Sequence, residues 1–302
     1  MYDLVIIGAG PAGLTAGLYA GRFRLTTLIL EKLTVGGRIL LTETIENFPG
    51  FYKGISSWQL IQQMEKQVKD LAVEFRIEEV RYIDCNKKIL KTDKATYTAK
   101  ALIIATGARA KRLNVEGEEK FIGKGVSYCA ICDAPLYKEK EVVIVGGGDA
   151  VAEEALYLAR FAKSVKIIHR REQLRASQIL KERLKENKKI DFILNSIVTE
   201  IIGQDKVKAV RIRNKDTEKQ EVIACEAVFI YIGYEPETAL IKGQIKLDEA
   251  DFIITDEKMQ TSQEGVFACG DCCKKDLYQV ITACAEGAIA ANSAYKYITQ
   301  KK

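Results

Sequence analysis

Histidine, tryptophan and proline are scarce in this chain, which contains one histidine, one tryptophan and four prolines among 302 residues. With so few prolines and no low-complexity tract, long disordered linkers are not expected. No apolar run approaches the roughly 20 residues that a membrane span needs. The sequence does not open with the charged and then apolar segments of a secretory signal. We therefore expect no membrane association and a cytoplasmic location.

An excess of one charge sign is also missing. The formal net charge is only +5, and a nucleic-acid-binding protein usually shows a concentrated basic patch. We therefore expect no nucleic-acid partner. Hydrophobic residues make up 47% of the chain and charged residues 29%, which is ordinary for a soluble globular protein. The length is sufficient for two domains.

The eight cysteines are scattered, which indicates cytosolic thiols plus one redox or metal pair and not a disulfide framework. That pair lies in Cys129-Ala130-Ile131-Cys132-Asp133. Two cysteines at this spacing can close a small disulfide, hold two thiols side by side or form half of a zinc site. Asp133 supplies a carboxyl group that a dithiol exchanging protons can use as an acid or base. Since a glycine-rich nucleotide loop follows, a redox-active pair that receives electrons from a cofactor is the favoured interpretation.

The first nucleotide-binding pattern lies at the start of the chain. Asp3–Ile7 predicts a strand buried on both faces, and it leads into Gly8-Ala9-Gly10-Pro11-Ala12-Gly13 and a helical stretch. These glycines permit a tight turn, close approach of a pyrophosphate, and packing of the helix on the strand. A second strand ends in Glu31, 23 residues after Gly8, where a carboxylate can accept from ribose hydroxyls. A later strand ends in Ala105-Thr106-Gly107, as is typical where the chain leaves the flavin domain of a two-dinucleotide flavoprotein.

The second pattern repeats the first. Glu141–Val145 predicts a strand, and Gly146-Gly147-Gly148-Asp149-Ala150-Val151 predicts a loop that opens a helix. The next strand is followed by His169, which lies 23 residues after Gly146 and so occupies the position of Glu31. The chain therefore contains an internal duplication of one nucleotide-binding plan. Val151 stands where a third glycine or alanine is usual, so we expect helix and strand to be pushed slightly apart.

The two copies differ in charge at that shared position. The first ends in an acid, whereas the second continues as His169-Arg170-Arg171, with Arg175 four residues further on. An acid repels a 2′-phosphate, and arginines bind one as bidentate donors. The sequence therefore predicts FAD in the first copy and NADPH in the second.

The last part of the chain predicts a return to the first domain. A strand ends at Ile232-Gly233, and a later one ends on Gly270-Asp271. The final helix is expected from about Gln279 to Tyr297, with its N-terminus placed to stabilise negative charge on a reduced flavin. The predicted fold class is α/β, with two Rossmann-like dinucleotide-binding domains and the NADPH domain inserted into the FAD domain. The expected domains are residues 1–112 and 238–302 for FAD and 113–237 for NADPH and the redox dithiol.

Cys269 and Cys272 form a second Cys-x-x-Cys, so a four-thiolate zinc site is formally possible. The two pairs are separated by far more than the roughly 15–20 residues of a compact zinc ribbon, and no histidine lies nearby. Cys269, Cys272 and Cys273 are expected to be ordinary thiols around the Gly-Asp turn, with an auxiliary dithiol to Cys269 as the minor alternative. The remaining cysteines are expected to be small buried hydrophobes: Cys85, Cys225 and Cys284.

Taken in order, these motifs resemble those of the low-molecular-weight thioredoxin reductases over essentially the full chain. The cysteine pair lies just before the second glycine loop, whereas glutathione-reductase-like enzymes have it in the first domain. The resemblance implies that Cys132 lies against the flavin, that Cys129 attacks the partner disulfide and that Asp133 shuttles the proton. Electrons would pass from NADPH through FAD and the Cys129–Cys132 dithiol to thioredoxin. Members are typically homodimers whose domains rotate, with residues 109–115 and 233–238 as hinges.

The motifs and the resemblance together imply a set of cofactor contacts and no metal ligand. The contacts are Gly8, Gly10, Pro11, Ala12, Gly13, Glu31, Gly37, Arg38, Asn47, Ala105, Thr106, Gly107, Gly146, Gly148, Asp149, Ala150, His169, Arg170, Arg171, Arg175, Ile232, Gly233, Gly270, Asp271, Gln279 and Val280. Two positions depart from the family pattern, since Arg38 replaces a glutamine and Tyr278 replaces an arginine.

Three other functions are compatible with parts of the sequence. The same chemistry could serve a glutaredoxin-like or peroxiredoxin-reducing acceptor. A thiol-independent diaphorase or ferredoxin–NADP reductase would have no need of Cys129 and Cys132. Ferredoxin-fed relatives typically lose the second glycine loop and the arginine cluster, and this chain has both. A zinc-binding module without enzymatic activity is the alternative from a different class.

Overall fold

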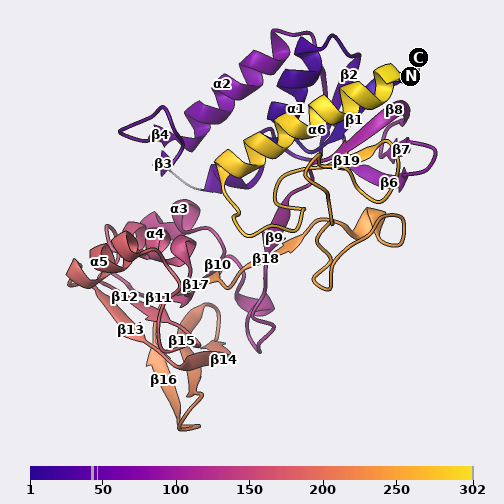
Figure 1. Ribbon diagram of the computed structural model, residues 1–302. Helices are drawn as coiled ribbons and strands as arrows, with labels where there is room; N and C mark the ends of the chain where they lie inside the picture. The colour runs from indigo at the N-terminus through magenta and orange to yellow at the C-terminus, as the bar shows by residue number, and fades with distance from the viewer. Residues whose placement is uncertain (42–43, 46, 301–302) are drawn as a thin grey trace. The chain divides into compact units, whose positions relative to one another are not determined.

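The computed structural model describes residues 1–41, 44–45 and 47–300. The chain forms two compact units, Met1–Arg109 with Glu235–Lys302, and Ala110–Tyr234 (Figure 1). The chain therefore leaves the first unit once and returns to it once. None of the helices in the described residues combines the length and apolar character that a membrane span requires.

A mainly parallel sheet is the centre of the first unit, with strand order β5-β2-β1-β8-β7-β6 and β19 paired to β8. The strands β1, β2, β5, β8 and β19 are mutually parallel, and β6 and β7 continue from β8 as antiparallel neighbours. The bounds are β1 Tyr2–Ile7, β2 Thr27–Glu31, β5 Glu74–Ile77, β6 Val80–Asp84, β7 Ile89–Thr92, β8 Thr96–Ile104 and β19 Val266–Ala268. A separate short pair comprises β3 Thr44–Ile45 and β4 Ile55–Ser56.

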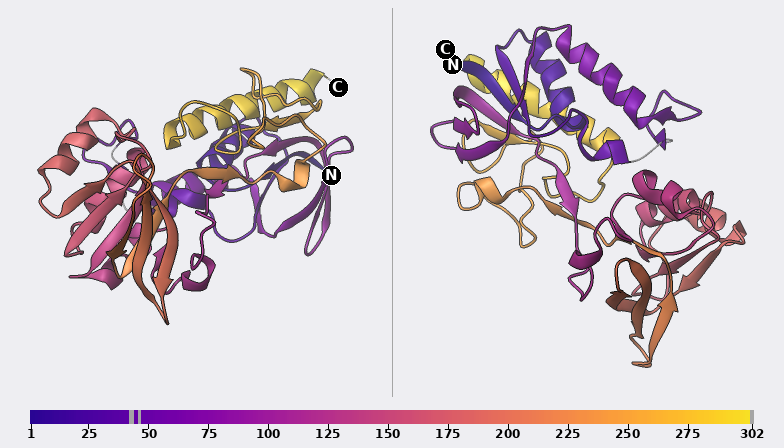
Figure 2. Two further views of the ribbon diagram at one scale, coloured as in Figure 1. Left: turned by 90° about the horizontal axis from the view of Figure 1, so that it is seen from below. Right: turned by 180° about the vertical axis from the view of Figure 1, so that it is seen from behind.

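The helices of the first unit are α1 Pro11–Arg22, α2 Ser57–Lys69 and α6 Val280–Gln300, with short 3-10 turns η1 Gly37–Leu41 and η4 Ala239–Ile241. The yellow α6 packs along the indigo α1 (Figure 2). Small residues make this contact close, because a Cβ on Gly287 of α6 would lie 2.2 Å from the carbonyl oxygen of Ala12 in α1. The last helix of the chain is thus fastened to the first.

The second unit repeats the parallel arrangement, with strand order β10-β17-β11-β12-β13. Its strands are β10 Val126–Ser127, β11 Glu141–Gly146, β12 Ser164–Ile168, β13 Ile190–Ile193 and β17 Ala227–Tyr231. Its helices are α3 Ala130–Asp133, α4 Asp149–Leu158 and α5 Gln178–Glu186, with 3-10 turns η2 Glu119–Phe121 and η3 Ala134–Tyr137. A three-stranded antiparallel sheet is added by β14 Ser196–Gly203, β15 Val207–Asn214 and β16 Gln220–Ala224. The connecting segments contain β9 Ala108–Ala110 and β18 Tyr234–Pro236, which pair with each other.

The observed fold confirms the predicted α/β class with two Rossmann-like sheets. In each unit the first strand lies between the strand that follows it and a later parallel strand, as the order β2-β1-β8 and the order β12-β11-β17 show. The direction of winding therefore reverses beside the first strand, which is where α/β sheets bind ligands at their carboxyl ends. The hairpin β6–β7 and the sheet β14–β16 are additions that the sequence motifs did not predict.

We expect the substitution Gly287→Ala to destabilise the protein, against the usual effect of this change. In a helix interior, alanine is favoured over glycine by about 1 kcal/mol. Here the added methyl group would meet the backbone of Ala12, and such overpacking costs roughly 1–3 kcal/mol. Thermal unfolding should show a lower Tm for Gly287→Ala, while Ser293→Ala in the same helix serves as the control for helix propensity. A Tm at or above that of the parent would contradict the close α1–α6 contact.

Candidate functional site

Two close backbone contacts fix the shape of the first glycine loop. Neither of them leaves room for a Cβ atom on the glycine involved. Gly8 has φ +102°, and a Cβ there would lie 2.3 Å from the carbonyl oxygen of Ala105. A Cβ on Gly13 would lie 1.9 Å from the carbonyl oxygen of Gly8. The ends of β1 and β8 and the first turn of α1 therefore meet backbone to backbone.

Gly10 faces a more open region. It is the N-cap of α1, makes no side-chain cap hydrogen bond and is followed by Pro11 at the first helical position. The nearest atom to a Cβ on Gly10 would be the carbonyl oxygen of Gly36, at 3.8 Å. An uncapped helix start with space in front of it suits an anionic pyrophosphate group, which accepts from the N–H groups of the first turn.

Glu31, the last residue of β2, lies beside the first glycine loop. Its carboxylate accepts hydrogen bonds from the N–H of Ala9 at 2.9 Å and of Leu33 at 3.2 Å. The side chain is therefore held beside the glycine loop, at the place where a ribose would lie in a dinucleotide complex. Its negative charge fits a ribose with free hydroxyl groups and opposes a 2′-phosphate.

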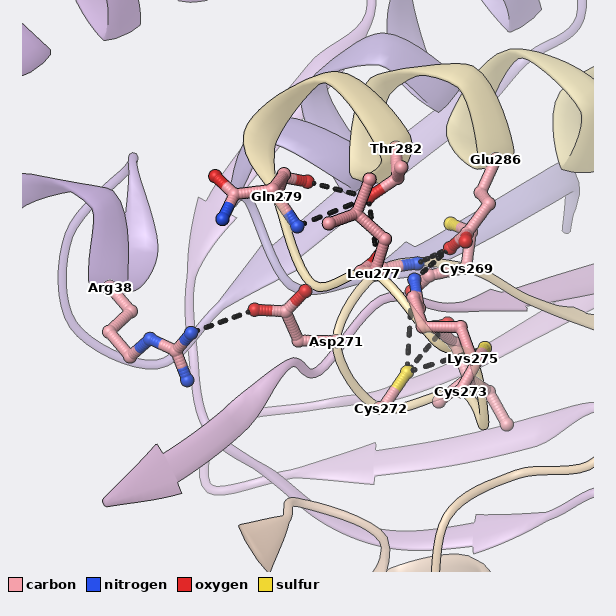
Figure 3. A network of polar contacts seen from close by, with 12 residues as sticks. Arg38, Cys269, Asp271, Cys272, Cys273, Lys275, Leu277, Gln279, Thr282 and Glu286 are labelled. Carbon is pink, nitrogen blue, oxygen red and sulfur yellow. Dashed lines mark hydrogen bonds and ion pairs between the residues drawn. The ribbon is translucent and has the colours of Figure 1, made fainter. Parts of the chain in front are cut away.

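Residues from both ends of the chain meet beside the start of α6 (Figure 3). Arg38, at the second position of η1, forms an ion pair with Asp271, with Nη2 and Oδ2 separated by 3.0 Å. Asn47 donates to the side chain of Gln279 at 3.0 Å. Gly37 has φ +63° and lies against Gly10. The structure thus brings together the expected contacts Gly37, Arg38, Asn47, Asp271 and Gln279, together with Val280 as the first residue of α6.

The Gly270–Asp271 turn is held by a residue that the sequence reasoning missed. The carboxylate of Glu286 in α6 accepts from the N–H of Gly270 at 2.8 Å and pairs with Lys275. Both side chains of this ion pair are at least 85% buried. A Cβ on Gly270 would lie 2.8 Å from the Cβ of Ala12, so the turn also contacts the start of α1. The available signal was a single acidic residue within an alanine-rich helix.

Thr106 and Gly107 hold the segment that returns to the first unit. The Thr106 hydroxyl donates to the carbonyl oxygen of Glu237 at 2.7 Å, and the N–H of Glu237 donates to the carbonyl oxygen of Gly107 at 3.0 Å. Gly107 has φ +72°. These contacts give Thr106 and Gly107 a structural role at the end of β8.

The second glycine loop has the same close approach of two strands. Gly146 has φ +144°, and a Cβ there would lie 2.1 Å from the carbonyl oxygen of Tyr231 and 2.6 Å from Cγ2 of Val151. Val151 is buried, so its methyl group fills the space that Gly146 leaves free. The expected separation of helix and strand by Val151 stays a prediction.

His169 and the segment after it lie on this loop. A Cβ on Gly147 would lie 2.3 Å from Cε1 of His169, so the imidazole ring covers that glycine. The N–H of Arg175 donates to the carbonyl oxygen of Gly147, and the N–H of Ser177 donates to the carboxylate of Asp149, both at 2.6 Å. Residues 169–177 are therefore fastened to the loop at two points. Asp149 and Ala150 begin α4, with Gly148 as an N-cap that has no side-chain partner.

The three predicted arginines gather around His169. Arg170, Arg171 and Arg175 are all exposed. Burial is the largest cause that lowers the pKa of His169, and the charges of Arg175, Arg170 and Arg171 lower it further. The imidazole is thus neutral at neutral pH, and the guanidinium groups form a positive surface in front of it. Such a surface fits a 2′-phosphate, because guanidinium groups donate paired hydrogen bonds to phosphate oxygens.

The end of β17 completes the edge of this loop. Ile232 is about one-third exposed. Gly233 has φ +115°, and its carbonyl oxygen accepts from the N–H of Lys111 at 2.9 Å. The contact of Ile232 and Gly233 with a cofactor stays a prediction, as do the other cofactor contacts expected from the sequence.

The cysteine pair lies in the second unit, with Cys129 just before α3 and Cys132 within it. Cys129 precedes this short helix, is partly buried and is disulfide-bonded. Its N–H donates to the hydroxyl of Ser127 at 3.0 Å. The next N–H, of Ala130, donates to the hydroxyl of Tyr231 at 2.8 Å. Asp133 ends α3 and is half-buried. The side chain of Cys132 lies outside the described residues, so the Cys129–Cys132 pairing stays a prediction.

The other six cysteines are free thiols. Cys269, Cys272 and Cys273 are fully or almost fully buried, and the thiol of Cys272 donates to the carbonyl oxygen of Cys269 at 3.3 Å (Figure 3). The expected thiols around the Gly-Asp turn are therefore free, and an auxiliary dithiol to Cys269 stays an untested alternative. Cys85 and Cys225 are buried as expected, whereas Cys284 is only partly buried. Across the described residues, no cluster of metal-ligating side chains is present.

Fold and site together define a protein with two dinucleotide-binding units, of which the second also holds a cysteine pair. A model of the pyridine nucleotide-disulphide oxidoreductase family matches residues 2–287. The thioredoxin reductase of Peptoclostridium acidaminophilum is 45% identical over 99% of this chain and 97% of its own length. That of Listeria innocua is 42% identical over 100% of this chain and 95% of its own length.

A solved structure also shows similarity to a thioredoxin reductase. The crystal structure of Lactococcus lactis thioredoxin reductase in the FR conformation has 41% sequence identity and a TM-score of 0.97, covering 99% of this chain and all of that one. The chain therefore belongs to the pyridine nucleotide-disulphide oxidoreductase family. These matches confirm the resemblance to thioredoxin reductases found in the sequence motifs, and the family implies the use of a flavin and a pyridine nucleotide.

The lowered pKa of His169 gives a direct test of the arginine cluster. Because the chain has a single histidine, its imidazole proton resonance can be followed by NMR without assignment. We expect a pKa below the ordinary 6.5 in the folded protein and a rise toward 6.5 in Arg175→Gln. Arg213→Gln, in the same unit but outside the cluster, is the control and should leave the pKa unchanged.

The same shift predicts how stability depends on pH. A folded-state pKa below the unfolded value means that the unfolded chain binds more protons, so this contribution is fully present above about pH 6.5 and is lost as the pH falls through the folded pKa. An unperturbed titration of His169 near the ordinary value of about 6.5 in the folded protein would contradict both statements.

Proposed function

We propose that this protein is an NADPH-dependent flavoprotein disulfide reductase that reduces thioredoxin. FAD would bind at the first glycine loop, beside Glu31, and NADPH at the second, beside the arginine cluster. The cysteine pair would deliver the electrons to the acceptor. The observation that carries this proposal is that one unit, Ala110–Tyr234, contains both the second dinucleotide loop and the Cys129-x-x-Cys132 helix. We further propose a cytoplasmic homodimer.

The residues present fit both cofactors. The uncapped start of α1, the open space at Gly10 and the carboxylate of Glu31 suit FAD, whose ribose hydroxyls carry no phosphate. The exposed arginines at the end of β12 suit the 2′-phosphate of NADPH. The bound flavin would supply two-electron chemistry between the nicotinamide and the cysteine pair.

Arg38 and Asp271 give the first site a local charge balance. A lone carboxylate would oppose the negative charge that a flavin gains on reduction, and the guanidinium of Arg38 at 3.0 Å offsets it. Because Glu286 fixes the backbone of Gly270, Asp271 is presented to Arg38 from a rigid turn. This pair would therefore set the electrostatic environment of the bound flavin.

The thiol chemistry would proceed in two balanced exchanges. The Cys129 thiolate attacks one sulfur of the acceptor disulfide, which forms a mixed disulfide and releases one acceptor thiolate. The Cys132 thiolate then attacks the Cys129 sulfur, which closes the Cys129–Cys132 disulfide and releases the second acceptor thiolate. Asp133 would supply a proton to a departing thiolate. Cys129 suits the first role because it is only partly buried.

We expect Cys132→Ser to separate the two halves of the reaction. In an anaerobic titration, NADPH should still bleach the flavin absorbance, because nicotinamide and flavin do not need the cysteine pair. Thioredoxin reduction should fall at least a hundredfold, because the serine cannot resolve the mixed disulfide. Cys225→Ser, a change of a buried free thiol in the same unit, should retain both activities. Thioredoxin turnover by Cys132→Ser, or a purified protein that binds no flavin, would contradict the proposal.

We expect Arg171→Ala to weaken the preference for NADPH over NADH. A hydrogen bond to a charged group contributes about 1.5–3 kcal/mol, so the KM for NADPH should rise roughly tenfold or more while that for NADH changes little. Lys185→Ala, which removes an exposed charge elsewhere in the unit, is the control for net charge. Stopped-flow flavin reduction with each nucleotide measures the effect. Equal preference in the unmodified protein would refute the assignment of the arginine cluster.

A further inference from the structure

The cysteine helix α3 is too short to hold its own shape. It spans only Ala130–Asp133, and the N–H of Asp133 donates to the carbonyl oxygen of Cys129 at 3.2 Å. A first helical turn orders several residues for a single hydrogen bond, so an isolated turn is unstable in water. The orientation of Cys129 therefore depends on contacts that other elements make with this turn.

Two of these contacts engage the first N–H groups of the turn. The N–H of Cys129 donates to the hydroxyl of Ser127 at 3.0 Å, and that hydroxyl donates to the carbonyl oxygen of Cys129 at 3.1 Å. The N–H of Ala130 donates to the hydroxyl of Tyr231 at 2.8 Å, across 101 positions of the sequence. Ser127 is a near neighbour in the chain, so Tyr231 is the contact that joins the turn to a distant strand.

Tyr231 also contacts the second glycine loop, through its backbone. It is the last residue of β17 and pairs with Gly146 at the end of β11. A Cβ on Gly146 would lie 2.1 Å from the carbonyl oxygen of Tyr231, so loop and strand meet without room for a side chain. The carbonyl group of one residue thus contacts the loop assigned to NADPH, while its hydroxyl group holds the cysteine helix. The two attachments are chemically separate, because removing the hydroxyl leaves the carbonyl in place.

The ring between these two attachments is packed in place. Tyr231 lies against the hydrophobic cluster of the second unit, which includes Ala130, Ile144 and Phe229. The cysteine helix also packs on α4, the helix that follows the glycine loop. A ring held by such packing has few orientations, so its hydroxyl is kept facing the start of α3. A contact that positions a reactive group requires a side chain fixed in this way.

We propose that Tyr231 is a positioning residue for the redox pair, whose hydroxyl holds the first turn of α3 in the geometry of the Cys129–Cys132 disulfide. This inference rests on the proposed redox role of that pair. The hydrogen bond is observed with Cys129 in its disulfide form. Reduction by two electrons and two protons breaks the sulfur–sulfur bond and lets the turn relax, so the hydrogen bond stabilises the disulfide more than the dithiol. A more stable disulfide makes the dithiol a stronger reductant, as thioredoxin requires of its donor.

The main experiment measures the equilibrium between the Cys129–Cys132 pair and glutathione in the flavin-loaded protein. The protein dithiol and glutathione disulfide exchange to give the protein disulfide and two glutathione thiols, so atoms and electrons balance. Anaerobic samples at graded glutathione ratios are quenched with acid, and peptide mass spectrometry quantifies the protein disulfide. The equilibrium constant for its formation should fall roughly threefold to tenfold in Tyr231→Phe, the range expected for the loss of one hydrogen bond.

Tyr137→Phe is the matched control for the loss of a tyrosine hydroxyl. Tyr137 packs against the same hydrophobic cluster, with its ring edge-on to Phe229 of β17 and the ring centroids 5.9 Å apart. This variant should have the equilibrium constant of the parent. Both variants should also keep the parent KM for NADPH in flavin reduction, because Tyr231→Phe retains the carbonyl group at the glycine loop. General damage to the unit would change that KM as well.

Amide hydrogen exchange tests the contact directly and begins with the unmodified protein. The first N–H groups of a helix have no partner within it, so the N–H of Ala130 depends on Tyr231 for its hydrogen bond. We expect slow exchange at Ala130 in the parent with its disulfide intact, and roughly tenfold faster exchange in Tyr231→Phe. Fast exchange in the parent would overturn the inference even if Tyr231→Phe failed to fold.

An unchanged equilibrium constant in Tyr231→Phe would overturn the inference, as would an equal fall in Tyr137→Phe. The equilibrium and exchange measurements use neither NADPH nor thioredoxin, so their failure is distinct from failure of the proposed function. A parent-like constant for Tyr231→Phe of a protein that reduces thioredoxin would refute only the role of Tyr231. A lowered constant in a protein that does not reduce thioredoxin would refute only the assigned acceptor.

Discussion

Both dinucleotide loops depend on one steric constraint, the close approach of a glycine to a carbonyl group at the carboxyl end of a neighbouring parallel strand. Gly8 meets the carbonyl oxygen of Ala105, and Gly146 meets that of Tyr231, each at a distance that excludes any Cβ. The constraint brings the carboxyl ends of two strands together and aims the following helix at the space between them. The other site residues of each unit are arranged around this meeting point. Because it is made of backbone, it is independent of which cofactor each unit receives.

In the proposed assignment of the cofactors, side chains at a single matched position add the specificity for each nucleotide. At the end of β2, Glu31 is fastened by backbone N–H groups, so its charge is fixed in place. At the end of β12, His169 is buried over Gly147 and the arginines after it face solvent. One copy thus offers a fixed anion and the other a group of solvent-exposed cations. If the proposed assignment holds, a duplicated backbone plan serves two nucleotides because a few residues outside the glycine loop discriminate between them.

Much of this arrangement was predictable from local sequence. The strands, the glycine loops and the positions of Glu31 and His169 follow from apolar runs and fixed spacing, which are properties of neighbouring residues. The bracing of Gly270 by Glu286, the sheet β14–β16 and the burial of Glu154 were not predicted. Each of these joins segments that are distant in sequence or depends on how deeply a helix face is buried, and hydrophobic periodicity does not report which distant element covers a residue. The burial of Glu154 did have a signal in the sequence, because this acid lies within the apolar stripe of α4.

The order of segments along the chain has a consequence for biosynthesis. Because β19 and α6 belong to the first unit but follow the second unit in the chain, the first unit lacks a strand and a packing helix until these segments have been synthesised. The inserted unit, by contrast, has its whole sequence available roughly 70 residues earlier, allowing domain-wise folding during synthesis. Nascent chains would therefore pass through a stage in which the inserted unit is complete, while the surface of α1 that α6 covers in the folded protein is still exposed.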